Sequence, residues 1–375
     1  MMTKRRTLSI AMLFLGAGIT VSSCKKSKNE NPTPQYTVPA TYTFDNVEYK
    51  ESAARLSMSL AFSSYIGKAT SRDVNQDSLN NLWNNIGGHF TAEIVVNQPY
   101  SFSDLNGLGY NISGKIADAS VFKAYADSMV VMSGKRTITG AQGVAGKVGS
   151  RLVNYRGMEF NQLVAKGFFG ALSLNNVVEL LNKTTTDDNN TVVAGTGTAM
   201  QHDWDLAFGY VGLPKSYDSS INYTVTPYNT NPERPLGFGG YFYERARPIK
   251  AGGIVFEAFR KGRAAIVAKD YTGRDAAAAT IKEYMEKTLA SAAYAYLSLS
   301  KTRTTDAERF HDFSEATGFM LALKYRSTTL LSSSAYQEIM DTINVDFWLL
   351  SDASLLNTKV TAIQSKLVAA YGKLD

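Results

Sequence analysis

The residues of this chain that are best suited to chemistry form two histidine–carboxylate pairs at helical spacing. The chain has 375 residues and only three histidines, two of which form these pairs. His202 lies three residues before Asp205 in MQHDWDLAF, and His311 lies four residues before Glu315 in RFHDFSEATGF. Both spacings place the two side chains on one side of a helix. Glu159, at the start of another predicted helix, could join them, and imidazole with carboxylate suits a divalent metal such as iron, zinc or manganese.

A structural role for the same residues is the alternative, and it is the interpretation that we favour. Asp205 could stabilise a helix N-terminus, an effect of roughly 0.3–1 kcal/mol. His202 could bond to a backbone carbonyl and His311 to Glu315 within a buried polar network. The helix predicted over residues 306–325 is apolar on almost every side, so an ionisable group in it needs a partner.

Other motifs with known chemistry are incomplete in this sequence. Residues 140–150, GAQGVAGKVGS, hold Ala141 and Val148 where a phosphate-binding loop needs glycine and serine or threonine. Residues 195–198 lack the third glycine of a dinucleotide fingerprint, and residues 187–190 lack the glycine and final glutamate of a calcium-binding loop. No Gly-x-Ser-x-Gly and no His-Glu-x-x-His sequence occurs, so the common serine hydrolases and zincin peptidases have no support.

A long stretch over residues 213–253 is dense in Pro, Gly, Asn and Tyr, and we predict one long loop there. Aromatic residues beside arginines can form a surface that stacks against sugars, porphyrins or peptides. They can equally hold the loop down on the helices beneath it, and we favour this second interpretation. The residues concerned are Tyr217, Tyr223, Tyr228, Phe238, Tyr241, Phe242 and Tyr243, with Arg245 and Arg247.

The N-terminus has the pattern of a bacterial lipoprotein signal. Basic residues at positions 4–6 precede an apolar run over 8–21, and VSSC at 21–24 resembles a lipobox. The apolar run is too short to span a bilayer and has the flanks of a secretory signal. We therefore expect residues 1–23 to be a cleaved signal peptide and Cys24, the only cysteine, to carry the acyl chains that anchor the protein to a membrane.

Composition constrains the chain after the expected anchor. Residues 24–41 comprise the acylated cysteine and a polar, proline-containing stretch, which we interpret as a flexible tether. Loss of the three basic residues of the leader lowers the formal net charge from +6 to +3, so nucleic acid binding has no support. Residues 42–375 are predicted to form a helical domain, built either as one unit or as two bundle halves that meet near residues 185–200.

Apolar residues recur every three or four positions through most of the mature chain, which predicts an all-α fold. Asp275 is the expected N-cap of one helix. Gly167 and Gly170 each weaken another helix by about 1 kcal/mol relative to alanine, which indicates either a neighbouring element that packs close or a break in the helix. The predicted helices cover residues 53–67, 120–132, 155–183, 252–269, 275–300, 306–325, 333–350 and 351–371.

Four segments carry a resemblance to a known family: FDNVEYKESAARLSMSLAFSSYI, GMEFNQLVAKGFFGAL, GTAMQHDWDLAFGYVGLP and HDFSEATGFMLALKY. The chain resembles the domain-of-unknown-function 4856 family of Gram-negative cell-envelope lipoproteins, which is distantly similar to the imelysin-like proteins. Imelysin-like proteins are helical-bundle lipoproteins linked to iron uptake. The resemblance implies an imelysin-like helical bundle that is exported and binds a ligand. The Gly-x-His-x-x-Glu motif of imelysins does not occur here, so the resemblance does not carry a peptidase activity with it.

These observations lead to one functional expectation and two alternatives. We expect a cell-envelope lipoprotein, anchored to the outer membrane and facing the periplasm or the surface, that binds a ligand as an accessory to iron or haem acquisition. An outer-membrane transporter is its expected partner. One alternative is a metal-dependent hydrolase, with Glu159 or Glu315 as the base beside a metal held by His202 and His311. The other is a surface glycan-binding protein that uses the aromatic loop.

Overall fold

The structure is a computed structural model that describes residues 36–223 and 233–375. The expected signal peptide, Cys24 and the part of the expected tether before residue 36 lie outside the described residues. Tyr228 of the aromatic stretch does so as well.

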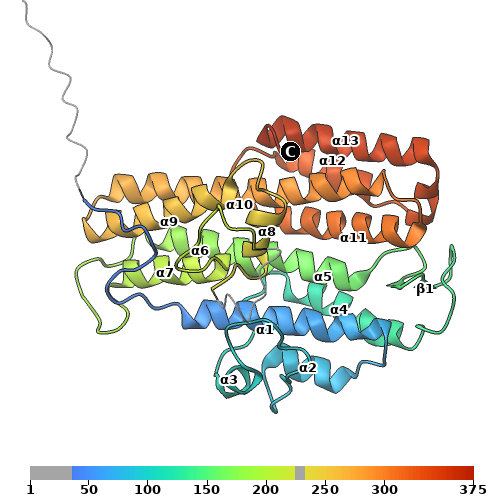
Figure 1. The fold of residues 1–375 in the computed structure, drawn as a ribbon, viewed down its shortest axis with the longest axis horizontal. Helices are drawn as coiled ribbons and strands as arrows, with labels where there is room; N and C mark the ends of the chain where they lie inside the picture. Colours follow the sequence, from blue (N-terminus) through green and yellow to red (C-terminus); the bar gives the residue numbers. More distant parts are fainter. Residues whose placement is uncertain (1–35, 224–232) are drawn as a thin grey trace, which may run out of the picture. The chain divides into compact units, whose positions relative to one another are not determined.

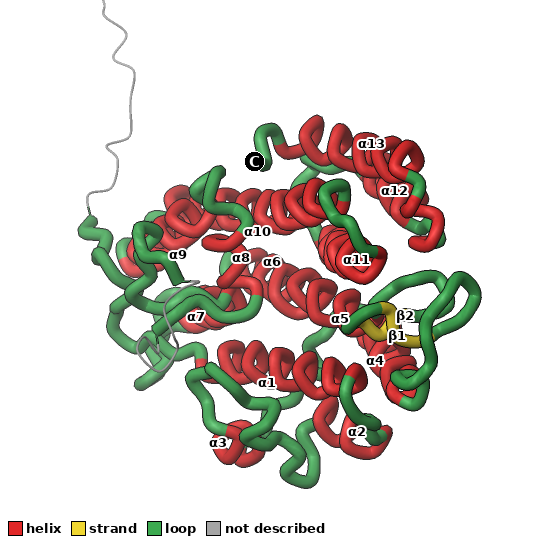
Figure 2. Tube along the Cα trace, turned by 45° about the vertical axis from the view of Figure 1, so that its right-hand side comes forward, coloured by secondary structure: helices red, strands yellow, loops and turns green. Residues whose placement is uncertain are grey.

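Helices make up most of the described chain, which confirms the all-α prediction. A short antiparallel hairpin of β1, Gly146–Val148, and β2, Arg151–Val153, lies in the glycine-rich region, with Lys147 opposite Leu152 (Figure 2). The helices are α1 (Lys50–Gly67), α2 (Gln76–Asn84), α3 (Phe102–Gly107), α4 (Ala119–Ser133), α5 (Phe160–Phe168), α6 (Asn175–Lys183), α7 (Ala199–Val211), α8 (Phe238–Glu244), α9 (Ala251–Val267), α10 (Tyr271–Ser300), α11 (Asp306–Ala322), α12 (Ser333–Ile343) and α13 (Ala353–Tyr371).

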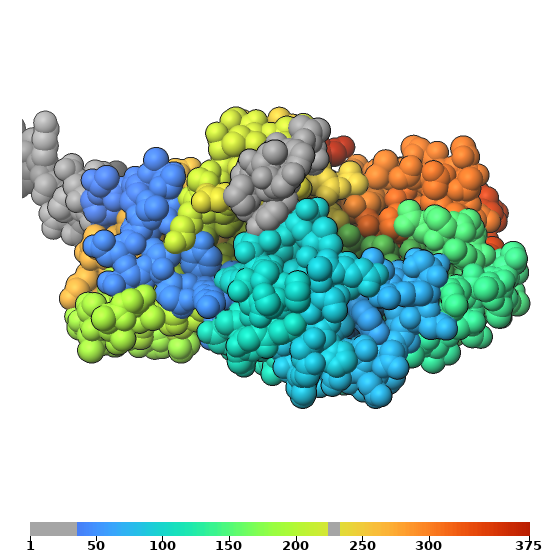
Figure 3. All heavy atoms as spheres, turned by 60° about the horizontal axis from the view of Figure 1, so that its bottom comes forward, coloured from blue at the N-terminus to red at the C-terminus, as the bar shows by residue number. Residues whose placement is uncertain are grey.

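The long helices lie side by side in layers (Figure 1). One layer holds α1, which packs on α5 and α7, and the next holds α5, α6 and α7. The following layer holds α9, α10 and α11, in which α10 packs against both neighbours and α11 packs on α5. The pair α12 and α13 covers the far side of α10. In the space-filling view of Figure 3, α1 to α3 and their connections gather on one face.

The helix predicted over 155–183 begins at Phe160 instead and continues to Lys183, with a π-helical segment, Phe169–Leu174, between α5 and α6. A Cβ atom on Gly167 would lie 2.2 Å from the ring of Phe122, and one on Gly170 would lie 2.3 Å from the backbone of Ala322. These glycines therefore let α4 and α11 approach closely. The prediction of a neighbouring element at these two positions is confirmed.

Helix α11 is buried along nearly its whole length, as its apolar composition predicts. Phe310, Phe313, Phe319 and Met320 are each 0% exposed, and they face several different elements. Thr305 caps this helix by accepting a hydrogen bond from the backbone N–H of Glu308. The polar side chains of α11 are consequently enclosed, which makes their partners important for the candidate site.

Two local predictions differ from the structure. The expected N-cap Asp275 lies inside α10, because Asp270 accepts a hydrogen bond from the backbone N–H of Gly273 and begins the helix five residues earlier. The expected loop over 213–253 contains α8, and α9 begins at Ala251. Burial of Phe238 and Phe242 stabilises a helix there in spite of two adjacent glycines, which shows tertiary packing overriding local propensity.

Residues Tyr36–Asp375 group into one compact unit, which begins six residues before the expected domain start. Helices α6 and α7, on either side of the connection near 185–200, pack directly against each other. No helix in the described ranges has both the length and the apolar character needed to cross a membrane.

Candidate functional site

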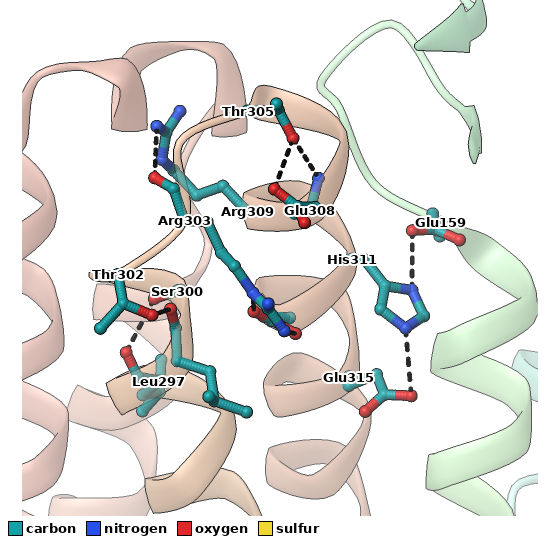
Figure 4. Close-up of polar contacts among 12 residues, drawn as sticks. Glu159, Leu297, Ser300, Thr302, Arg303, Thr305, Glu308, Arg309, His311 and Glu315 are labelled. Atoms are coloured by element: carbon teal, nitrogen blue, oxygen red, sulfur yellow. Dashed lines mark hydrogen bonds and ion pairs between the residues drawn. The ribbon is translucent and has the colours of Figure 1, made fainter. Parts of the chain in front are cut away.

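His311 lies between two carboxylates that come from different helices (Figure 4). Its Nδ1 is 3.0 Å from Oε1 of Glu159, the residue that immediately precedes α5. Its Nε2 faces Oε1 of Glu315, one turn further along α11, at 3.6 Å. Both carboxylates are buried, with Glu159 1% exposed and Glu315 5% exposed. The backbone N–H of Glu159 donates to Oγ of Ser314, which holds the start of α5 against α11.

A lysine and two tyrosines extend this arrangement, and we call Glu159, His311, Glu315, Lys166, Tyr241 and Tyr296 together the His311 cluster. Lys166 of α5 places its Nζ 3.2 Å from Oε1 of Glu315 and donates a 2.7 Å hydrogen bond to the hydroxyl of Tyr241. Burial, followed by the nearby Glu315 carboxylate, raises the pKa of Tyr241 well above its ordinary value. The hydroxyl of Tyr241 lies 3.5 Å from that of Tyr296, so the chain of polar contacts reaches α10.

In the His311 cluster, basic side chains lie directly beside the buried carboxylates. The Lys166 ammonium lies beside Glu315, and the His311 ring presents one nitrogen to Glu159 and the other to Glu315. That ammonium occupies the place next to Oε1 of Glu315 that a metal ion would need. Among the described residues, no group of three or more His, Cys, Asp or Glu side chains is arranged to hold a metal ion.

The other two predicted site residues lie on α7 and have separate partners. Asp205 is 0% exposed and accepts hydrogen bonds from Nε of Arg263, at 2.9 Å, and from the hydroxyl of Tyr42, at 2.6 Å. Burial raises the pKa of Asp205, and Arg263 opposes that shift. His202 is half-buried, with its Nδ1 3.9 Å from Oε2 of Glu48. The structure thus brings together three of the five predicted residues, and a metal role for the five stays a prediction.

A surface cavity of about 790 Å³, which we call the α9 pocket, lies where α9 begins. Aromatic side chains from the predicted aromatic stretch and from α9 form much of its wall: Tyr217, Phe242, Tyr243 and Phe256. Gly252 and Gly253, in the first turn of α9, line it as well. Ala40, close to the first described residue, contributes from the N-terminal side.

Three basic side chains, Arg247, Lys250 and Arg260, also line the α9 pocket. Arg247 donates a 2.9 Å hydrogen bond to the hydroxyl of Tyr243 and lies over its ring, with 4.9 Å between the guanidinium carbon and the ring centroid. Arg260 lies over the ring of Phe256 in the same way, at 5.0 Å. The aromatic residues of the stretch are therefore packed against the helices and also line a cavity, and their use for ligand stacking stays a prediction.

Several of these residues were not singled out from the sequence. Lys166 lies seven residues after Glu159, which is two helical turns. This spacing could have indicated from the sequence that the two residues lie on one side of a helix. Lys250 and Arg260 belong to the pocket only because the chain before α9 folds back on that helix, and no local pattern reports this. Adjacent glycines at the start of a predicted helix, Gly252 and Gly253, were the one available signal.

Comparison with known proteins identifies one family. A family model described as a domain of unknown function, DUF4856, matches residues 109–372. This range includes the whole His311 cluster and every residue named for the α9 pocket except Ala40. No curated protein and no solved structure matches the chain.

Proposed function

The chain belongs to the domain-of-unknown-function family DUF4856, and from its own residues we propose a cell-envelope lipoprotein that acts as a ligand-binding module. In this proposal the protein is an accessory to iron or haem acquisition, and the ligand occupies the α9 pocket. The observation that carries the proposal is a cavity of about 790 Å³ that combines aromatic walls with a few polar groups. Pockets that bind small molecules have roughly 300–1,000 Å³ and this kind of lining.

The composition of the pocket supports a ligand with a flat, largely apolar body. Tyr217 and Tyr223 are stacked with 5.7 Å between ring centroids, and Phe256 meets Tyr217 edge-on at 5.7 Å. Such mutually supported rings hold their positions and can stack on a planar ligand. A porphyrin combines a planar apolar body with carboxylates, which would suit the basic residues beside these rings.

The lipid anchor of the proposal would keep the pocket near a membrane. Sixteen peptide units separate Cys24 from Ala40, which lines the pocket. A fully extended chain of that length reaches at most roughly 55 Å. An acylated Cys24 therefore places the pocket within reach of an outer-membrane transporter, the partner that we propose for delivery of the ligand.

Haem binding by a pocket-filling variant tests the proposal. A Cβ atom on Gly253 would meet Ser219 at 3.4 Å, an ordinary contact, so Gly253→Phe keeps the backbone and places a ring in the pocket. Gly240→Phe is the matched control, because a Cβ there meets nothing within 4 Å and Gly240 does not line the pocket. We expect wild type and Gly240→Phe to bind haem with micromolar affinity, and Gly253→Phe to lose at least about tenfold, measured by absorbance titration. Absence of haem and iron binding by wild type would remove the acquisition role.

The two alternatives differ in their support. A hydrolase that uses a metal between His202 and His311 has less, because these residues have no contact or partner in common in the described chain. A glycan-binding protein would use the same aromatic walls of the α9 pocket. Glycan binding that Gly253→Phe abolishes, in a protein that ignores haem, would favour the second alternative.

A further inference from the structure

The α9 pocket gathers cations that have no acidic partner. Among the described residues, no carboxylate oxygen lies within 4.0 Å of a side-chain nitrogen of Arg247, Lys250 or Arg260. Arg247 binds a tyrosine hydroxyl, and Arg260 donates to the carbonyl oxygen of Pro39 at 2.5 Å. Neither partner carries charge, so neither arginine is neutralised by its own hydrogen bond.

The two acidic residues of the lining are turned to other partners. Glu257 pairs with Lys261 of the same helix at 2.7 Å, so its charge is already balanced. Asp218 accepts a 2.8 Å hydrogen bond from the backbone N–H of Ser220, within its own turn. The three cations of the lining therefore outnumber its two carboxylates, and Glu257 has Lys261 beside it as well as Arg260.

The backbone adds to the same electrostatic preference. Helix α9 begins in the pocket, and the backbone N–H groups of Gly252 and Gly253 have no acceptor within the described part of the chain. The N–H groups of a first helical turn carry partial positive charge and favour an anion. Tyr217 leaves no room for a side chain at Gly252, because a Cβ atom there would lie 2.1 Å from its hydroxyl oxygen. The glycine thus keeps both the ring and the helix start at the pocket surface.

Resting on the proposed function, we infer that the α9 pocket selects a ligand with one or more carboxylate or phosphate groups on an apolar ring-containing body. The anionic group lies among Arg247, Lys250, Arg260 and the first turn of α9. The ring body lies against Tyr217, Tyr243 and Phe256. Arg247 and Arg260 suit this role because each guanidinium already rests on a ring and loses little freedom on binding.

The test compares two probes that share one ring system. 1-Pyrenebutyrate is an anion, and 1-pyrenebutanol is its neutral counterpart; binding of each is followed by fluorescence, with inorganic phosphate as a competitor. The protein is the mature chain as wild type, as Arg247→Gln/Arg260→Gln, and as the matched control Lys301→Gln. Lys301 is exposed at the end of α10 and does not line the pocket, and circular dichroism checks that each variant is folded.

We expect wild type and Lys301→Gln to bind the acid at least about tenfold more tightly than the alcohol, a preference that weakens with added salt. In Arg247→Gln/Arg260→Gln the acid should fall to the affinity of the alcohol. At constant ionic strength, phosphate should weaken binding of the acid more than binding of the alcohol, and an equal effect on both probes would contradict the anion subsite. Equal binding of acid and alcohol by wild type would overturn the inference while leaving a ligand-binding pocket in place. A preference that survives in the double variant, or binding of neither probe, would overturn it as well, and haem titration then decides the proposed function separately.

Discussion

Asp187 and Asp188 are neighbours in the chain, yet their carboxyl groups lie in opposite environments. Burial, followed by the adjacent Asp203, raises the pKa of Asp187 to about 6. Hydrogen bonds from Thr191 and Asn190 lower the pKa of Asp188 to about 2. The charge of Asp187 therefore opposes folding at neutral pH, whereas the charge of Asp188 supports it.

We expect Asp187→Asn to stabilise the protein at neutral pH. The pKa of Asp187 is raised on folding, so its cost is full above about pH 6, shrinks at about pH 5 and vanishes below the unfolded value near 4. Solvent screens this partly exposed group, and we expect a gain of up to about 1 kcal/mol in the free energy of unfolding at pH 7.5. Urea unfolding at pH 7.5 and 5 measures it.

Asp188→Asn is the matched control and should change stability in the opposite direction. Its lowered pKa means that the carboxylate stabilises the fold above the unfolded pKa and loses this effect as the pH falls toward 2. A loss of stability in Asp187→Asn at pH 7.5, or a gain in Asp188→Asn, would contradict these assignments.

A buried ion pair, Asp205 with Arg263, joins α7 to α9 and to the chain around Tyr42. Both charged side chains are 0% exposed. Arg263 also donates to the backbone carbonyl of Asp45 at 3.2 Å and lies over the ring of Phe44. A site residue predicted for metal binding thus has a buried structural partner, which bonds to its Oδ1.

Removal of one member of this pair should be more harmful than removal of both. We expect Asp205→Asn to lower the free energy of unfolding by about 3–5 kcal/mol, because it leaves the Arg263 charge buried without a counter-ion. Asp205→Leu/Arg263→Met should recover much of that loss, and Tyr42→Phe should cost only about 1 kcal/mol. Denaturant unfolding of the set measures the differences. If the double variant is no more stable than Asp205→Asn, the unpaired Arg263 charge is not the source of the effect.

At the scale of elements, close crossings between helices determine how the helices pack against one another. The π-helical segment between α5 and α6 meets the end of α11 where Gly170 faces Ala322. Nearby, Gly318 of α11 leaves no room for a side chain against Lys166, since a Cβ atom would lie 2.7 Å from its Cβ. These two glycines draw α5 and α11 together, which brings Glu159 and Lys166 within reach of His311 and Glu315.

The crossing predicts a sharp difference between two glycine-to-alanine substitutions. We expect Gly170→Ala to lower the free energy of unfolding by roughly 1–3 kcal/mol, because the new methyl group meets rigid backbone of Ala322. Gly67→Ala, at the end of α1 with nothing within 4 Å, should be neutral or stabilise by up to about 1 kcal/mol. Thermal unfolding compares the two. If Gly67→Ala lowers the thermal stability and Gly170→Ala leaves it unchanged, the π-helical segment and α11 do not pack closely at Gly170.

At the scale of the whole molecule, the chain after the expected anchor joins the folded unit through α9 and its neighbours. Tyr36 donates a 3.0 Å hydrogen bond to Oδ2 of Asp270, at the start of α10. Pro39 accepts one from Arg260, and Tyr42 stacks on Phe208 with 3.9 Å between ring centroids. The N-terminal segment is therefore held to the same helix that begins in the α9 pocket.

Loss of the expected acyl anchor should change location and leave the fold intact. We expect Cys24→Ala to move the protein from the membrane fraction to the soluble fraction, because a residue other than cysteine cannot carry the acyl chains. Cys24 precedes the compact unit Tyr36–Asp375 in the chain, so we expect the thermal midpoint and the ligand affinity to be unchanged. Fractionation measures the location, and mass spectrometry of the N-terminus measures cleavage and acylation. Calorimetry measures the thermal midpoint and the ligand affinity. An intact leader in the wild-type protein would contradict the anchoring.

Periodicity alone was sufficient for the fold class and for much of the helical content of this chain. The spacing of apolar residues placed the helices around α5, α10 and α11, because burial of one helical face is a local constraint. The same reasoning required partners for His311 and Glu315 in an apolar helix, and the structure supplies them. It could not recognise α8, whose glycines are outweighed by the burial of its aromatic side chains.

Tertiary structure alone decided which ionisable groups meet. His311 pairs with Glu159, 152 residues away, and Asp205 with Arg263, 58 residues away. The α9 pocket likewise joins Ala40 to residues between Tyr217 and Arg260. A helical pattern states which side of a helix is buried, but contacts between distant segments depend on how closely whole helices approach, and that was set here by glycines such as Gly170 and Gly318.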